Sequence, residues 1–156
     1  MRAPVVVVRS RPADPTGPVV AGVDPRRVGG VLEFAFAHAG RHGLALRVVH
    51  AGVLRRRLNL FRVERSIDVG GPGEEIAVGR LAEALASSFP GVRVDVREAR
   101  RRPLEALARE AVGASLLVIG TPARTARSRR QLGPVGRALA AVPVVAVVGP
   151  GRARAA

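Results

Sequence analysis

Short apolar runs alternate with segments of helical periodicity along most of the chain, and this alternation constrains the fold more than any other feature. Three apolar runs, 19–23, 116–119 and 144–148, and the largely apolar segment 44–50 are each too short for a helix. A fifth run, 92–97, alternates apolar and charged residues, which predicts a strand with one wet face at a sheet edge. Strands that alternate with helices favour parallel pairing through right-handed crossovers. We therefore expect an α/β fold, an open parallel five-stranded sheet with helices on both faces, Rossmann-like.

Four helices are expected between these strands. The first carries one apolar face and ends near Gly40 and Gly43, the second starts at Glu74 and ends at Pro90-Gly91, the third starts at Pro103, and the fourth spans about 133–141. Segment 52–73, with three glycines near its end, is expected to be a long loop. The predicted buried faces are Val28, Leu32, Ala35 and Phe36, then Val78, Leu81, Leu85 and Phe89, then Leu104, Leu107, Ala108 and Ala111.

The chain opens with a segment of the kind that ends the domain. Residues 3–8 (APVVVV) resemble residues 142–148 (VPVVAVV), although short valine runs also recur by chance. A proline-rich linker follows at 11–18. We expect an N-terminal strand and linker at 1–18, one domain at 19–148 and a basic C-terminal tail at 149–156.

Composition limits the chemistry that the chain can carry. There is no cysteine, which excludes disulfides, thiolate metal sites and cysteine nucleophiles. The apolar run after Met1 is shorter than a signal-peptide core, and no run approaches the length of a membrane span. We expect a cytoplasmic protein with no membrane partner.

The net charge of +14 allows two interpretations. Clustered cations bind nucleic acid by releasing counterions from phosphates, but every basic residue here is arginine, as expected where arginine simply fills solvated positions. Aromatic residues make up only 3% of the chain, which disfavours stacking on bases. We do not expect a nucleic-acid partner.

Residues 17–148 resemble the universal stress protein family. The similarity lies in Val20-Ala21-Gly22-Val23-Asp24, in 46–51 (LRVVHA) and in Leu117-Val118-Ile119-Gly120. The resemblance implies an adenine nucleotide, ATP or AMP, at the carboxyl ends of the strands. It also implies a homodimer through the last strand, 144–148, whose apolar edge invites pairing.

Nucleotide-binding members of that family carry a glycine loop of the form G-x2-G-x9-G-[S/T]. Here the spacing falls on Gly120, Ala123, Gly133 and Pro134. Glycines let main-chain N–H groups approach phosphates and a helix N-terminus adds positive potential, whereas Pro134 supplies neither an N–H nor a hydroxyl. The spacing of the motif is kept, but two of its residue types are replaced. We therefore expect weakened nucleotide binding. The alternative role of Pro134 is that it simply begins a helix.

The resemblance assigns further residues to the site. Asp24 matches the family's acidic residue near the adenosine, and it also suits an N-cap of the first helix. Val49 lies where main-chain groups meet the base, and Val135 follows the glycine loop. Arg124, with Arg127, Arg129 and Arg130, can neutralise phosphate or form an exposed basic loop.

No catalytic set is evident, so we expect a protein that acts by binding and dimerisation rather than as an enzyme. His38 and His42 are four residues apart without a third ligand nearby, and no metal is expected. The alternative is an interaction module of the same fold that no longer binds nucleotide.

Overall fold

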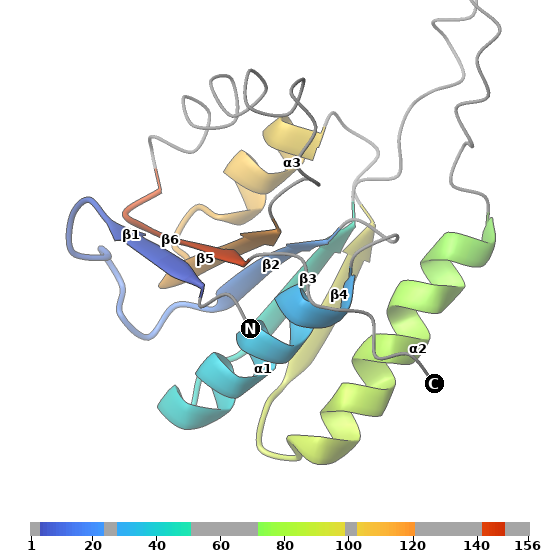
Figure 1. Ribbon diagram of the computed structural model, residues 1–156. Helices are drawn as coiled ribbons and strands as arrows, with labels where there is room; N and C mark the ends of the chain where they lie inside the picture. Colours follow the sequence, from blue (N-terminus) through green and yellow to red (C-terminus); the bar gives the residue numbers. More distant parts are fainter. Residues whose placement is uncertain (1–3, 24–27, 51–71, 99–102, 121–141, 149–156) are drawn as a thin grey trace, which may run out of the picture.

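The computed structural model describes residues 4–23, 28–50, 72–98, 103–120 and 142–148. These residues form one six-stranded sheet and three helices (Figure 1). The strands are β1 (Val5–Val8), β2 (Val19–Val23), β3 (Leu46–His50), β4 (Val94–Glu98), β5 (Leu116–Gly120) and β6 (Val144–Val148). The helices are α1 (Val28–His42), α2 (Pro72–Ser88) and α3 (Pro103–Glu110).

The strand order is β1-β6-β5-β2-β3-β4. All pairs from β6 across to β4 are parallel, and β1 alone among the described strands is antiparallel to its neighbour. The predicted parallel five-stranded sheet and the additional N-terminal strand are both confirmed. Strand β4 lies at an edge, as its alternating sequence predicted.

Helices cover both faces of the sheet. Helices α1 and α2 lie on one face and α3 on the other (Figure 1). The strands follow this division residue by residue: Val19 and Ala21 of β2 join the core cluster that contains α1, whereas Val20 joins the cluster that contains residues of α3. Two apolar layers therefore enclose the central strands, which explains why β2 and β5 are apolar without alternation.

Helix α1 confirms the predicted apolar face. Leu32, Ala35 and Phe36 are fully buried. The helix ends at a glycine in the left-handed conformation, Gly43 with φ of 64°, and the Leu44 N–H donates to the Ala39 carbonyl over 2.9 Å. This six-to-one bond with glycine at the turn is a Schellman cap, a backbone geometry that a side chain at position 43 would strain.

Three local predictions need correction. Helix α2 begins at Pro72, two residues before Glu74, because proline is well accommodated in a first helical turn. In α3, Ala106 is buried against the sheet while Ala108 is only half-buried, so the apolar stripe is rotated from the predicted one. Val96 of β4 is 46% exposed, so the alternation there marks an edge strand with little burial on either face.

Some predictions fall outside the described residues: the fourth helix at 133–141, the loop at 52–73 apart from its last two residues, and the tail at 149–156. The side chains of Val28 and Leu104 also lie outside them. In the described ranges, no helix is both long enough and apolar enough to cross a membrane.

The edge of β6 is occupied within the same chain. Strand β1 pairs with it from Val5↔Val147 to Val8↔Val144. The expected N-terminal strand is thus present and pairs within its own chain. The predicted homodimer through the last strand therefore remains a prediction that requires β1 to leave this edge.

Candidate functional site

The sheet has one topological switch point, between β2 and β5. From β2 the chain continues outward to β3 and β4, whereas β5 leads to β6 on the other side. The strands that follow β2 and β5 in the chain therefore lie on opposite sides of this pair, and in open parallel sheets ligands bind at the carboxyl ends of the strands where the strand order reverses in this way. Topology alone places the candidate site here.

Just below that edge, a row of three residues faces α3. Gly22 pairs with Ile119 on one side and with Val49 on the other. A Cβ on Gly22 would lie 2.6 Å from Leu107 Cδ2, so only glycine lets α3 approach the sheet this closely. Val49 is 1% exposed, and its side chain belongs to the core. Val49 can serve a ligand only through its main chain.

The last residues of β2, β3 and β5 form a row that faces α1. Gly120, the last residue of β5, is exposed in this row. Its neighbours in the sheet end are closed to solvent, with Val23 7% and His50 8% exposed. A Cβ on Gly120 would lie 3.2 Å from Val31 Cγ2 of α1. The missing side chain thus leaves the main chain of β5 open to solvent at the switch point, which is the form that close approach of a ligand to the backbone requires.

The N-terminus of α1 contributes the electrostatics of this edge. The helix follows β2 directly, so its first turn, which begins at Val28, lies at the carboxyl edge of the sheet. That first turn contains no acidic residue. The helix dipole therefore presents positive potential that no acidic side chain within the turn offsets, which favours an anionic group.

Of the predicted site residues, the structure brings Val49 and Gly120 to the same edge, on strands that flank β2. Asp24, Ala123, Arg124, Gly133, Pro134 and Val135 lie outside the described residues. Sequence reasoning missed the role of Gly22 in helix packing. A glycine inside an otherwise apolar strand is the signal that could have found it.

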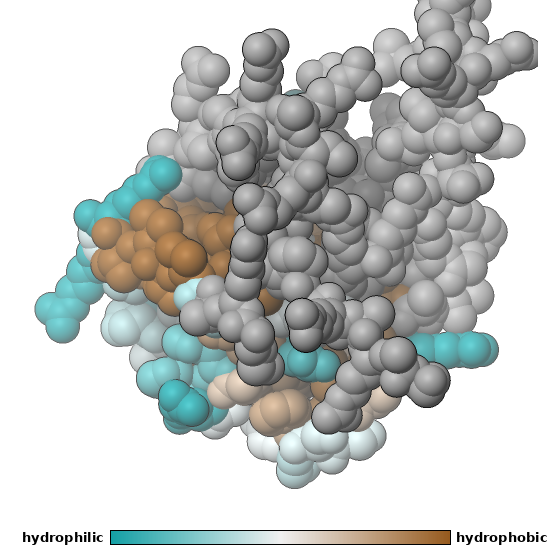
Figure 2. Space-filling model, viewed as in Figure 1, coloured by the Kyte–Doolittle hydropathy of each residue, from teal (hydrophilic) through white to brown (hydrophobic). Residues whose placement is uncertain are grey.

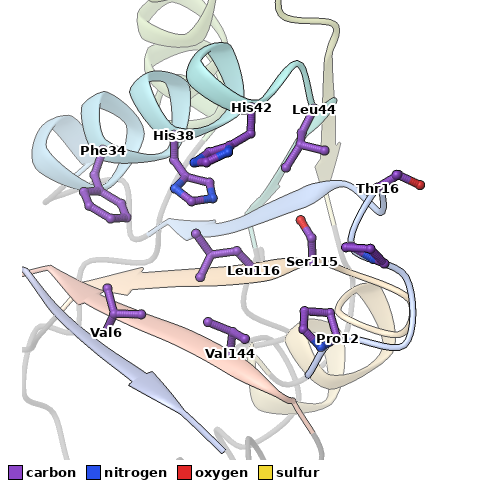
Figure 3. Close-up of a pocket in the computed structure, with 11 residues that line it drawn as sticks. Val6, Pro12, Thr16, Phe34, His38, His42, Leu44, Ser115, Leu116 and Val144 are labelled. Atoms are coloured by element: carbon purple, nitrogen blue, oxygen red, sulfur yellow. The ribbon is translucent and has the colours of Figure 1, made fainter. Parts of the chain in front are cut away.

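A separate hollow of about 360 Å³ lies at the opposite edge, where the strands begin (Figure 3). His38 and His42 of α1 face it, with their ring centroids 4.4 Å apart. Leu116 and Val144 also line it. The pKa of His38 is lowered, first by burial and then by the charges of His42 and Arg41. Among the described residues that line the hollow, none is a carboxylate that could offset this effect.

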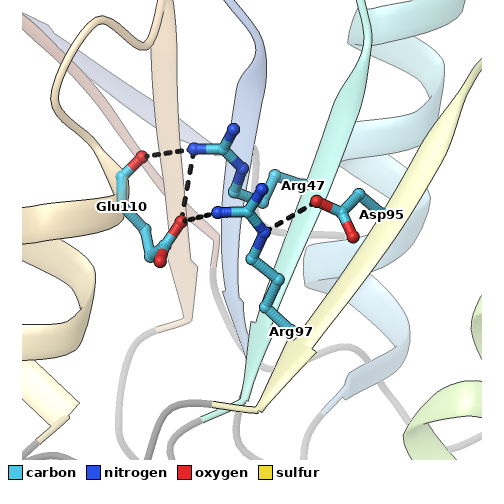
Figure 4. Close-up of polar contacts among 4 residues, drawn as sticks. All are labelled: Arg47, Asp95, Arg97 and Glu110. Atoms are coloured by element: carbon cyan, nitrogen blue, oxygen red, sulfur yellow. Dashed lines mark hydrogen bonds and ion pairs between the residues drawn. The ribbon is translucent and has the colours of Figure 1, made fainter.

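A polar cluster ties α3 to the outer strands (Figure 4). The main-chain carbonyl of Glu110, the last residue of α3, accepts from Arg47 Nη1 over 3.2 Å. Its carboxylate forms an ion pair with the same nitrogen at 3.2 Å and accepts from Arg97 Nη1 over 2.9 Å. Arg97 also donates to Asp95 over 2.7 Å, and this bond is the main reason that the pKa of Arg97 is raised. The cluster lies beside the helix end rather than at the switch point, and it fits a structural role. Over the described part of the chain, no three His, Cys, Asp or Glu residues are grouped to hold a metal ion.

These features define an α/β domain whose candidate ligand site is the carboxyl edge of its sheet at the β2/β5 switch point. The particular family follows from the sequence: the profile described as the universal stress protein family matches residues 16–148. The chain belongs to the universal stress protein family. A search of curated proteins finds no match.

Solved structures of universal stress proteins share the fold. One, described as a universal stress protein in complex with cAMP, is 21% identical over 87% of this chain and 98% of its own, with a TM-score of 0.62. A universal stress protein from Archaeoglobus fulgidus DSM 4304 is 18% identical with a TM-score of 0.64, and this chain spans half of its length. A further Archaeoglobus fulgidus universal stress protein, in complex with dAMP, is 19% identical over 86% of this chain and 98% of its own, with a TM-score of 0.50.

Proposed function

We propose that this domain binds an adenine nucleotide at the β2/β5 switch point and acts in the stress response by binding rather than by catalysis. The observation that carries the proposal is the exposed main chain of Gly120 beside the closed ends of β2 and β3. Two solved universal stress proteins are described in complex with cAMP and dAMP, both adenine nucleotides. Their fold is the fold of this chain, which supports the same ligand class here.

Different parts of this sheet edge suit different parts of such a ligand. The positive potential at the start of α1 suits the phosphate, since the N-terminal end of a helix dipole favours anions and this turn has no acidic residue. The main chain at Gly120 is open to a ligand that must approach closely, because no Cβ stands in the way. In the part of the chain that the structure describes, no paired carboxylates or nucleophile–base pair point to a reaction, and binding alone is proposed.

Calorimetric titration of the full chain with AMP, cAMP and ATP tests the proposal, with GMP to check base selectivity. Gly120→Ala should weaken adenine nucleotide binding at least tenfold, because the added methyl group covers the open main chain and presses on Val31. Gly91→Ala is the matched control, since a Cβ there meets nothing within 4 Å, and its affinity should equal that of the natural chain.

A second candidate function is an interaction module that no longer binds nucleotide. It rests on two sequence departures in the glycine loop, Ala123 and Pro134. No heat with any adenine nucleotide at millimolar concentration, from the natural chain and from a chain with both loop positions restored, would favour this candidate over the first.

A further inference from the structure

The hollow at the amino ends of the strands is formed by parts of the chain that are far apart in the sequence (Figure 3). Helix α1 contributes one wall, the starts of β5 and β6 with a residue of β1 contribute another, and the segment between β1 and β2 contributes Pro12 and Pro15. The volume of about 360 Å³ lies within the range of about 300–1,000 Å³ that is usual for small-molecule pockets. The hollow can therefore hold a small organic ligand, and it lies at the edge of the sheet opposite to the switch point.

Most residues that line the hollow are apolar. Val6, Leu116 and Val144 come from three neighbouring strands, β1, β5 and β6, and Phe34 comes from α1. Val6 also belongs to the apolar patch that Figure 2 shows over β1, where the four valines are between 41% and 68% exposed. A hydrocarbon that covers such a surface is stabilised, because both apolar surfaces leave water. The main part of a ligand for this hollow should therefore be a hydrocarbon chain.

Two imidazoles and one hydroxyl are available to a polar head group in the same hollow. His38 and His42 lie one helical turn apart on α1, with ring centroids 4.4 Å apart. Ser115 is 9% exposed, and its hydroxyl lies 3.5 Å from the Pro18 carbonyl, beyond the usual range of about 2.5–3.0 Å for O–H···O bonds. The Ser115 hydroxyl is therefore held only weakly, and it can donate to a ligand instead. Each neutral imidazole adds one N–H donor, so these groups offer three donors.

The charges around the hollow favour an anionic head group beside the histidines. Strands β1, β5 and β6 contain no charged residue, and the described residues that line the hollow include no carboxylate. Burial lowers the pKa of His38, and the charges of His42 and Arg41 lower this pKa further. On the other side of the hollow, Asp14 accepts a hydrogen bond from the Thr16 hydroxyl over 2.6 Å. Negative charge is thus already present beside Thr16, whereas the described lining supplies none to the histidines.

We propose that this hollow binds a small aliphatic carboxylate of about eight carbon atoms. The carboxylate accepts hydrogen bonds from His38, His42 and Ser115, and the chain lies against Leu116 and Val144. The volume corresponds to about twelve non-hydrogen atoms, at the roughly 30 Å³ that one molecule occupies in liquid water, and an eight-carbon acid is slightly smaller. Imidazoles and a hydroxyl, rather than arginine forks, suit one carboxylate better than a phosphate dianion. This inference does not depend on nucleotide binding, which is proposed for the opposite edge.

Ligands that share one chain and differ in the head group test the proposal on the full chain. Octanoate should shift the ring resonances of His38 and His42 in NMR spectra to saturation. Calorimetry should show binding about tenfold or more tighter than for octanol, octylamine or octyl phosphate. Equal affinities for octanoate and octanol would overturn the role of the charge, and tighter binding of octyl phosphate would overturn the choice of a carboxylate. An excess of AMP should leave the octanoate affinity unchanged, and displacement of octanoate by AMP would overturn its placement in this hollow.

Binding should be coupled to the protonation of His38. A carboxylate beside the imidazole favours its charged form and raises its pKa, so the complex takes up protons and octanoate binds about two- to tenfold more tightly at pH 6 than at pH 7.5. Octanoate itself stays ionised, because comparable side-chain carboxyls titrate at about pH 4. Calorimetry in two buffers of different ionisation enthalpy measures the uptake, and an affinity that does not rise on acidification would overturn the contact with His38. The other charged residues of the surrounding elements do not line the hollow: Arg9, Arg11, Asp14, Glu33 and Arg41.

Two variants remove the proposed donors separately. The double change His38→Gln/His42→Gln and the single change Ser115→Ala should each weaken octanoate binding about fivefold or more. Ser115→Ala keeps the main-chain bond of residue 115 to the Pro18 carbonyl, 3.1 Å long, so this variant should fold even if the histidine variant does not. The matched control is Ser87→Ala, since Ser87 is exposed on α2, donates within its own helix, and should have no effect on affinity. An octanoate affinity equal to that of the natural chain in the folded variants would overturn the inference.

Discussion

Gly22 of β2 lies directly beneath Leu107 of α3, so close that a Cβ on the glycine would lie 2.6 Å from Leu107 Cδ2 and 3.0 Å from its Cδ1. Gly22→Ala must therefore push α3 away from the sheet or force Leu107 from its rotamer. Overpacking of this kind costs about 1–3 kcal/mol of unfolding free energy. Urea denaturation followed by circular dichroism should show a lower midpoint with an unchanged slope.

The control for that prediction is a glycine with free space around it. Gly79, inside α2, would place a Cβ where nothing lies within 4 Å. Since alanine is the better helix former, Gly79→Ala should raise the unfolding free energy by about 0.5–1 kcal/mol. If both substitutions shift the midpoint in the same direction, the packing explanation for Gly22 is wrong.

The polar cluster yields a second prediction because its members differ in burial. Glu110 is 24% exposed and holds two arginines, and Arg47 Nε is buried without an acceptor among the described residues. Glu110→Ala removes the carboxylate partner of both arginines and leaves the half-buried Arg47 only its hydrogen bond to the main-chain carbonyl of residue 110, which should cost about 1–3 kcal/mol. Thermal unfolding at two salt concentrations measures the loss.

Asp95→Asn supplies the comparison, because the Asp95–Arg97 pair lies at the surface, with exposures of 55% and 44%. Exposed ion pairs contribute little to stability. The melting temperature of this variant should match that of the natural chain within error. A larger loss for Asp95→Asn than for Glu110→Ala would mean that the cluster does not depend on Glu110.

Acid should destabilise the fold through His38. Its pKa in the folded chain is lowered by burial and by the charges of His42 and Arg41, so between that pKa and the ordinary value of 6.5 the unfolded chain binds more protons. The contribution is complete above pH 6.5 and is lost as the pH falls through the lowered pKa. Melting temperature should therefore fall between pH 7.5 and pH 5.5.

His38→Gln should reduce that pH dependence, because glutamine is neutral throughout the range. His42→Gln should reduce it less, since it removes one of the charges that lower the pKa of His38 but leaves its burial. Asp14, whose pKa lies below 3.8 because of hydrogen bonds from Thr16, titrates outside this window. An unchanged pH profile in His38→Gln would assign the effect to other groups.

Most of the fold could be predicted because the strands of the parallel sheet are short runs that are largely apolar, or alternate apolar and charged residues as in β4, and because characteristic residues mark the ends of the helices. The extent of β2 and β6 and the C-terminal end of α1 at Gly43 follow from local sequence. The rotation of α3 toward Ala106 could not be predicted, because Ala106 and Ala108 are equally apolar and only packing against the sheet selects between them. Likewise, the alternating pattern of β4 does not show that no helix covers Val96, so its exposure could not be predicted.

The candidate site was predictable in position and less so in detail. Gly120 and Val49 were expected at the carboxyl edge, and strand order places them there. The burial of the Val49 side chain was not evident, because a valine at a strand end has the same local pattern whether or not a helix covers it. Pairing of β1 with β6 in the same chain depends on the reach of the linker and on competing strand pairings, neither of which can be read from the local sequence.

The last prediction concerns the two departures in the glycine loop. Ala123 adds a methyl group where close main-chain approach is expected, and Pro134 has neither an N–H nor a hydroxyl to donate to a phosphate. Hydrogen bonds to charged groups are worth about 1.5–3 kcal/mol each, so the natural chain should bind ATP about tenfold to several hundredfold more weakly than a chain with Ala123→Gly and Pro134→Ser.

Asp24→Ala should weaken whatever adenine nucleotide binding is measured, because the carboxylate is expected near the adenosine. Calorimetry with ATP and AMP measures both effects, and since AMP lacks the outer phosphates, the double change should improve ATP binding more than AMP binding. Low micromolar ATP binding by the natural chain, unchanged in the double variant, would show that the loop does not act through these two positions.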